Sequence, residues 1–186
     1  IEAFRAEVST FGYLDHGQWC GKVYYYDSER GIPGAIVNNV FRNGERQWDR
    51  NLFVQGSVEY SFSPRYQIKG SAKWAWDYMR FLRDDPKELY IDNSYYQQEA
   101  YLSVANIFRM TSWWDFSASI DAQWNTMNAN MSNFMYPTRW TQYVSVASAF
   151  KYGGLSAQAS VLGTFVHDCI GNEYVGGRRM TCRDEF

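Results

Sequence analysis

The residues of this sequence best suited to acid–base chemistry are its two histidines and a pair of aspartates on one predicted strand. His16 and His167 are predicted to lie at opposite ends of the strand pattern. Asp115 and Asp121 share one strand face, but six residue steps separate them by about 20 Å. Catalytic groups must lie within hydrogen-bond reach of one another, and no Ser–His–acid cluster is visible. The sequence therefore predicts no enzymatic activity and no cofactor.

Metal binding is considered for two other groups of residues. Met127, Met131 and Met135 recur at every fourth position and could offer thioethers to Cu(I). The same spacing would form an apolar stripe on a short loop helix, which we favour. His167 and Cys169 alone are too few for a metal site, so none is predicted.

The three cysteines are Cys20, Cys169 and Cys182. Cys169 and Cys182 lie in a polar, glycine-rich tail and could pair in an oxidising compartment, which spacing alone leaves open. Cys20 is expected to be unpaired in a strand.

Composition excludes several classes of protein. Acidic and basic residues nearly balance, for a net charge of −2, and they are spread throughout, which argues against a nucleic-acid partner. No apolar run approaches the roughly 18 to 20 residues of a transmembrane helix. The first residues, Ile1 to Arg5, lack the features of a signal peptide, so an export signal was removed or was never part of this piece.

Alternation of apolar and polar residues predicts eight strands. It is clearest from Trp114 to Thr126, and Tyr66 to Tyr78 repeats it. The full set of candidate strands is 4–8, 19–25, 52–62, 66–78, 100–108, 114–126, 144–152 and 155–165. The longest exceed the usual soluble length of about 5 to 6 residues and match the 9 to 11 needed to cross a bilayer.

The apolar faces of these strands favour a membrane over a soluble β-sandwich. Ala and Gly occupy their middle, whereas Trp, Tyr and Phe stand at their ends, as in the aromatic girdles of outer-membrane barrels. Aromatic residues make up 19% of the sequence. The predicted fold is all-β: a segment of about eight antiparallel transmembrane strands, occupying residues 1–186.

Connection lengths orient the predicted strands. Tight turns are expected at 13–17, 63–65, 111–113 and 153–154, and long connections at 28–50, 83–96, 127–138 and from Asp168 onward. In outer-membrane barrels the short turns face the periplasm and the long loops face outward. Both chain ends are then expected outside the cell, which suits a piece of a larger barrel wall.

One segment resembles a known family. Tyr24-Tyr25-Tyr26-Asp27-Ser28-Glu29-Arg30-Gly31-Ile32-Pro33-Gly34 resembles a stretch that rises from a barrel strand into an outer loop in TonB-dependent receptors, especially those of Bacteroidetes. The resemblance implies a 22-stranded barrel filled by a plug domain. No plug and no energy-coupling box is found here. The parent protein would import a scarce large nutrient such as a siderophore, cobalamin or a glycan.

Ligand-binding residues are expected in the outer loops and upper lumen. Candidates are polar or aromatic residues near the tops of ascending strands, with a solvated loop or a structural pair between strands as the alternative for each. They are Tyr26, Asp27, Arg30, Trp48, Arg50, Asp77 and Arg80.

Two other functions stay open at this point: a passive outer-membrane porin or channel, and an adhesion or scaffold barrel. The expected location is the outer membrane of a Gram-negative bacterium. Expected partners are outer-membrane lipid, a nutrient ligand, the inner-membrane TonB complex through the plug of the parent, and a surface lipoprotein. The isolated piece is expected to self-associate through its unpaired edges.

Overall fold

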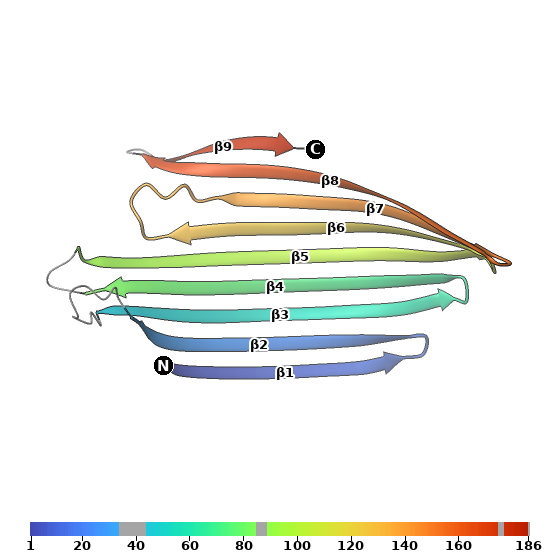
Figure 1. Cartoon of the computed structure of the whole chain (residues 1–186), viewed down its shortest axis with the longest axis horizontal. Helices are drawn as coiled ribbons and strands as arrows, with labels where there is room; N and C mark the ends of the chain where they lie inside the picture. Colours follow the sequence, from blue (N-terminus) through green and yellow to red (C-terminus); the bar gives the residue numbers. More distant parts are fainter. Residues whose placement is uncertain (34–43, 85–88, 175–176, 186) are drawn as a thin grey trace.

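A computed structural model of the chain describes residues 1–33, 44–84, 89–174 and 177–185. These residues form a single antiparallel sheet of nine strands (Figure 1). The strands are β1 (Glu2–Leu14), β2 (Gly17–Ile32), β3 (Glu45–Ser63), β4 (Tyr66–Arg83), β5 (Ile91–Thr111), β6 (Trp114–Ala129), β7 (Thr138–Tyr152), β8 (Leu155–Tyr174) and β9 (Gly177–Glu185).

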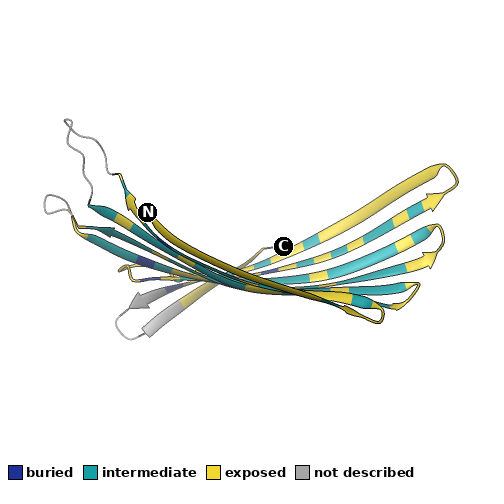
Figure 2. Ribbon diagram, turned by 90° about the horizontal axis from the view of Figure 1, so that it is seen from below, coloured by how far each residue is buried: buried dark blue, intermediate teal, exposed yellow. Residues whose placement is uncertain are grey.

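The strands are ordered as they follow one another in the chain, and each pairs with its neighbours in sequence. β1 and β9 form the two edges, so the sheet is open and strongly twisted (Figure 2). Within the described ranges, no helix is long and apolar enough to cross a bilayer. The class of fold is therefore an all-β antiparallel meander.

All eight predicted strands are present, and the ninth, β9, was missed. The prediction of a polar tail from Asp168 onward is wrong, because β8 continues to Tyr174 and β9 pairs with it, from Val166↔Glu185 to Tyr174↔Gly177. This hairpin lacks apolar alternation and is held by backbone pairing and a disulfide. β9 runs back toward the short turns, and its last described residue, Glu185, pairs with Val166 about midway along β8 (Figure 1).

The tight turns lie where they were predicted, at one end of the sheet (Figure 1). The Ser63 hydroxyl accepts hydrogen bonds from the backbone N–H groups of Arg65 (3.3 Å) and Tyr66 (3.1 Å), which stabilises the β3–β4 turn. Gly153 has a φ of 58°, a left-handed conformation that suits glycine. At Gly17 an added Cβ would lie 2.2 Å from the Glu59 carbonyl oxygen, so no larger residue fits.

The long connections are shorter than predicted, because polar pairs extend the strands past the apolar alternation. Arg46 of β3 donates to Glu29 of β2 at 2.6 Å, and Arg80 of β4 donates to Asp92 of β5 at 2.7 Å. Arg46 and Glu29 both lie within the predicted loop 28–50, and Asp92 lies within the predicted loop 83–96. The central part of the first loop, residues 34–43, lies outside the described residues.

The predicted methionine helix is absent from residues 127–137. Met127 lies within the last three residues of β6, Met131 lies in a bend, and Met135 lies outside any helix or strand. Asn133 and Tyr136 have positive φ angles of 70° and 42°, which are incompatible with an α-helix. The Met135 carbonyl accepts a hydrogen bond from Gly171 of β8 at 2.7 Å, so this connection packs against the β8 strand.

The register keeps apolar and polar side chains in phase across the sheet, which gives it two unlike faces. On one face Val54 pairs with Val23 and Trp74, and Ile120 pairs with Val104 and Val144. We call this the apolar face. The polar face carries pairs such as Lys73–Glu99, 2.9 Å apart.

The apolar face is bare. Leu102 is 56% exposed and Ile120 is 62% exposed, although both lie in the middle of central strands. None of the described residues is a large side chain with full burial. The sheet therefore has no hydrophobic core of its own, and its apolar face needs something to cover it.

Two rows of aromatic rings border the apolar face. Near the short turns, ring centroids lie 5.4 Å apart for Phe62–Tyr66 and 4.7 Å apart for Tyr66–Phe108. Toward the long connections, Tyr78 and Tyr96 lie 4.9 Å apart, and Trp124 and Trp140 follow at 6.3 Å. Tyr66 and Tyr78, both on β4, are separated by about 40 Å along the strand. A strand tilted by about 40° would bring that to about 30 Å of height.

Candidate functional site

The seven predicted ligand residues all lie toward the long connections, but they divide between the two faces. Tyr26, Arg30 and Asp77 belong to the polar face. Asp27, Trp48, Arg50 and Arg80 belong to the apolar face, beyond or beside the aromatic row that lies toward the long connections. Trp48 and Arg50 are near the start of β3, which descends from the long connections, so their assignment to an ascending strand is wrong.

The charged side chains among the apolar-face candidates form ion pairs with residues of neighbouring strands. Arg50 Nε donates to Asp27 at 2.9 Å, and Tyr25 donates to the same carboxylate at 3.0 Å. Arg80 makes two hydrogen bonds of 2.7 Å to Asp92 and lies 5.2 Å above the Trp48 ring. These contacts match the alternative considered for each candidate, a structural pair between neighbouring strands. They favour a structural role for these residues over ligand binding.

The pair of Arg80 and Asp92 lies past Tyr78 and Tyr96, closer to the long connections than that aromatic row. Its hydrogen bonds from the guanidinium hold the pKa of Asp92 below the usual range, against a smaller opposing effect of desolvation. The same bonds raise the pKa of Arg80. Both groups are therefore charged at neutral pH, and together they join the ends of β4 and β5.

The polar-face group gathers around one hollow of about 350 Å³. Its lining comes from strands β2 to β6, near the long connections. The register between these strands brings the lining side chains together. The residues that line it are Tyr26, Arg30, Asp49, Asn51, Asp77, Tyr78, Met79, Tyr95, Gln97 and Met127. The sequence analysis did not predict seven of these as ligand residues, because only the cross-strand register places them near Tyr26: Asp49, Asn51, Tyr78, Met79, Tyr95, Gln97 and Met127.

Internal bonds hold the charged side chains of this hollow. Arg30 lies 3.0 Å from Asp49, and Asn51 donates to Asp77 at 2.5 Å. The side chains of Tyr26 and Gln97 form no hydrogen bond to another residue within the described part of the chain. The hollow thus offers a phenol and an amide beside charged groups that are already fixed, an arrangement that can bind a polar organic ligand.

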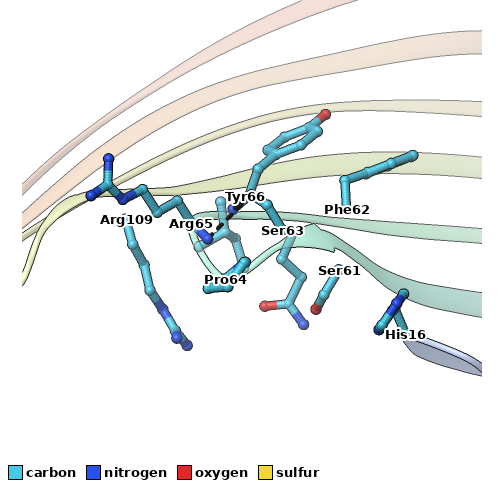
Figure 3. Close-up of a pocket in the computed structure, with 10 residues that line it drawn as sticks. His16, Ser61, Phe62, Ser63, Pro64, Arg65, Tyr66 and Arg109 are labelled. Carbon is cyan, nitrogen blue, oxygen red and sulfur yellow. Dashed lines mark hydrogen bonds between the residues drawn. The ribbon is translucent and has the colours of Figure 1, made fainter.

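A second hollow, of about 400 Å³, lies among the short turns at the opposite end of the sheet (Figure 3). His16, Arg65 and Arg109 line it, and its lining contains no carboxylate. Among the described residues, none pairs with the guanidinium of Arg65 or of Arg109. The sequence analysis missed this basic group because its members come from three separate connections or strand ends.

Cys169 and Cys182 form a disulfide that joins β8 to β9, and Cys20 is a free, exposed thiol on β2. His16 and His167 lie at opposite ends of the sheet, so they cannot act together. Asp115 and Asp121 share the polar face of β6. Asp121 accepts a hydrogen bond from Tyr101 at 2.8 Å, which gives it a structural partner.

The fold and the hollow define a two-faced antiparallel sheet with a polar recess at one end. Comparison with known proteins adds no family to this description, since neither a family model nor a curated protein sequence matches the chain.

Proposed function

We propose that this chain is part of the barrel wall of a TonB-dependent transporter in the outer membrane of a Gram-negative bacterium. The observation that carries the proposal is the bare apolar face, bordered by two aromatic rows and backed by a polar face. A bilayer covers such a face and solvates its aromatic borders, while the polar face lines a lumen.

Strand length supports a membrane over a second protein layer. β5 has 21 residues and β3 has 19, well beyond the strands of ordinary soluble sheets. A soluble sandwich fills the middle of its interface with large aliphatic side chains. Here the middle of the apolar face includes Gly56, Gly70 and Ala72, which pack poorly against a second sheet.

The hollow on the polar face supports transport of a ligand. In the proposed orientation, the short turns face the periplasm and the hollow lies at the outer end of the lumen. The Tyr24–Ile32 part of the family-like segment forms the end of β2 toward the long connections, where Tyr26 and Arg30 line that hollow, and Pro33 follows the strand. Gly34 lies outside the described residues. The imported nutrient would be a large polar molecule such as a siderophore, cobalamin or a glycan.

The open edges agree with a wall that continues. Nine strands are about two fifths of the 22 found in plugged outer-membrane transporters. Each edge leaves a row of unpaired backbone groups, which need another strand. We expect the isolated chain to require detergent and to self-associate.

Refolding in detergent tests whether this chain is part of a membrane barrel wall. The chain is refolded in detergent micelles and, separately, diluted into aqueous buffer, and its circular dichroism and its gel migration with and without heating are compared. Detergent-dependent β structure with heat-modifiable migration is expected. A cooperatively folded monomer in plain buffer would exclude the membrane proposal.

The transporter and a passive channel differ in what precedes this segment in the parent gene. A transporter requires a plug domain and an energy-coupling box upstream. Deleting the parent gene should then abolish uptake of the limiting nutrient across the outer membrane, and de-energising the inner membrane should have the same effect. Uptake that persists without an energised inner membrane would favour the passive channel.

A further inference from the structure

Four side chains form a square on the apolar face where β8 meets β9. His167 and Cys169 are two residues apart on β8, and their register partners on β9 are Asp184 and Cys182. Residues two apart on a strand point the same way, so all four project from one face. The square lies toward the long connections, beside Trp140, the register partner of His167 on β7.

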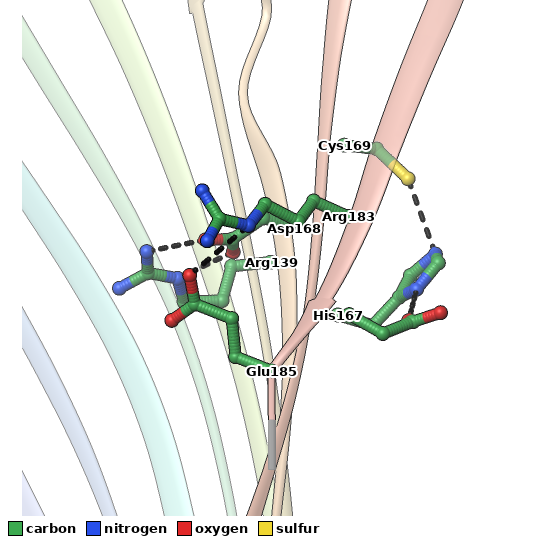
Figure 4. A network of polar contacts seen from close by, with 7 residues as sticks. Arg139, His167, Asp168, Cys169, Arg183 and Glu185 are labelled. Atoms are coloured by element: carbon green, nitrogen blue, oxygen red, sulfur yellow. Dashed lines mark hydrogen bonds and ion pairs between the residues drawn. The ribbon is translucent and has the colours of Figure 1, made fainter.

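The square orients its histidine. Nδ1 of His167 lies 2.5 Å from a carboxylate oxygen of Asp184, and Nε2 lies 3.2 Å from the sulfur of Cys169 (Figure 4). With Nδ1 donating its proton to Asp184, Nε2 keeps its lone pair and faces the cysteines. A carboxylate behind a histidine is the arrangement that orients and strengthens histidine ligands in metal sites.

The donor atoms are close enough for one ion. The His167 nitrogen and the sulfurs of Cys169 and Cys182 all lie within 4.8 Å of one another. Tetrahedral zinc, with bonds of about 2.3 Å to sulfur and 2.0 Å to nitrogen, needs donor atoms roughly 3.5 to 3.8 Å apart. Once the sulfur–sulfur bond is cleaved, small side-chain rotations reach these separations.

We propose that the reduced form of this square is a zinc site, in which Cys169, Cys182 and His167 are the ligands and Asp184 orients the histidine. Water fills the fourth position. The disulfide and the metal site exclude each other, because the same two sulfurs make both. The oxidation state of the pair therefore decides whether β8 and β9 are joined covalently or through a metal ion. This inference is independent of the proposed transport function.

The chemistry balances with a tertiary phosphine as reductant. The phosphine attacks one sulfur and breaks the sulfur–sulfur bond. Water then supplies the oxygen of the phosphine oxide, and its two protons convert the two sulfurs to thiols. Binding of a divalent ion displaces those two protons into solvent and leaves two thiolate ligands.

The test uses the whole chain, refolded in detergent, in a Cys20→Ser background that leaves only the paired cysteines. Cobalt(II) is titrated before and after phosphine reduction, followed by the sulfur-to-cobalt charge-transfer absorption, and zinc is titrated against a chromogenic chelator. One equivalent of each metal should bind after reduction only. The oxidised chain should bind at least 100-fold more weakly.

Single substitutions separate the roles of the four residues. Cys182→Ser should abolish the charge-transfer band of the paired thiolates, and His167→Ala should weaken binding at least tenfold and change the cobalt spectrum. Asp184→Asn, which preserves shape, should weaken binding 10- to 100-fold, the usual effect of losing such an orienting group. Circular dichroism checks that each variant keeps its β structure.

His16→Ala and Asp115→Asn are matched controls, since these residues lie far from the square, and both should bind metal as the parent does. Equal metal affinity in the oxidised and reduced chains would overturn the proposal. So would a His167→Ala variant whose affinity and spectrum are unchanged, because the thiols alone would then account for binding.

Discussion

Leu102 offers the sharpest test of what covers the apolar face. It lies on β5, six residues from Tyr96 and six from Phe108, at the midpoint between the two aromatic rows. Its neighbours in register, Ala72 and Ala122, are small, and its side chain is 56% exposed. An arginine at this position would meet whatever surrounds the middle of the sheet.

The expected cost of Leu102→Arg depends on that surrounding. In water, a substitution at so exposed a position changes the free energy of unfolding by about 0.5 kcal/mol or less. At the midplane of a bilayer, an arginine on the lipid-facing side of a barrel costs about 2 to 4 kcal/mol. If a bilayer covers the apolar face, Leu102→Arg should therefore lower the folding equilibrium constant by about 30- to 700-fold.

Ser103→Arg is the matched control, one residue along the same strand and on the opposite face. Its register partner is Asp121, so the new guanidinium gains a nearby carboxylate, and little loss of stability is expected. Denaturant unfolding of both variants and the parent chain, refolded into lipid vesicles, measures the difference. Equal stability of the two arginine variants, within about 0.5 kcal/mol, would refute the assignment of this face to lipid.

Two further predictions concern the ends of the strands. Because Arg80 lowers the pKa of Asp92 in the folded chain, this carboxylate stabilises the fold above its unfolded pKa of about 4, and that stabilisation is lost as the pH falls through the lowered folded value. Asp92→Asn should thus be less stable than the parent at pH 7 and equal to it in strong acid; a difference that persists in acid would contradict this, and Asp15→Asn is the control. The Cys169–Cys182 disulfide closes a ring across 13 positions, worth about 3 kcal/mol in the chain-entropy model. Reduction without metal should speed amide hydrogen exchange in β9 on the order of 100-fold and leave β4 unchanged, whereas equal protection of β9 in both states would show that backbone pairing alone holds the hairpin.

Period-two alternation was sufficient to predict the all-β class, eight of the strands and the tight turns. The reason is local: side chains of a strand alternate between faces, so a sheet with two unlike faces leaves its pattern in each strand separately. Trp114 to Thr126 carries that pattern without any knowledge of its neighbours. β9 was missed because Arg183, Asp184 and Glu185 are polar on both faces and leave no such pattern.

The extent of the strands near the long connections was decided by pairs between strands. Arg46–Glu29 and Arg80–Asp92 join residues 17 and 12 positions apart in sequence, so no local pattern marks them. For the same reason the predicted ligand residues could be assigned to the end of the sheet that carries the long connections but not to a common site. The extension of β2 to Ile32 places Tyr26 on one face and Asp27 on the other, because successive side chains of a strand point to opposite faces.

The sequence by itself determined that this chain forms long, two-faced strands joined alternately by tight turns and longer connections, because alternation and turn chemistry act over a few residues. Only the tertiary structure decided which side chains meet. The hollow around Tyr26 and the square of His167, Cys169, Cys182 and Asp184 each bring together residues from different strands. Their meeting depends on the hydrogen-bonded register between strands, in which a shift of one residue would move every side chain to the other face.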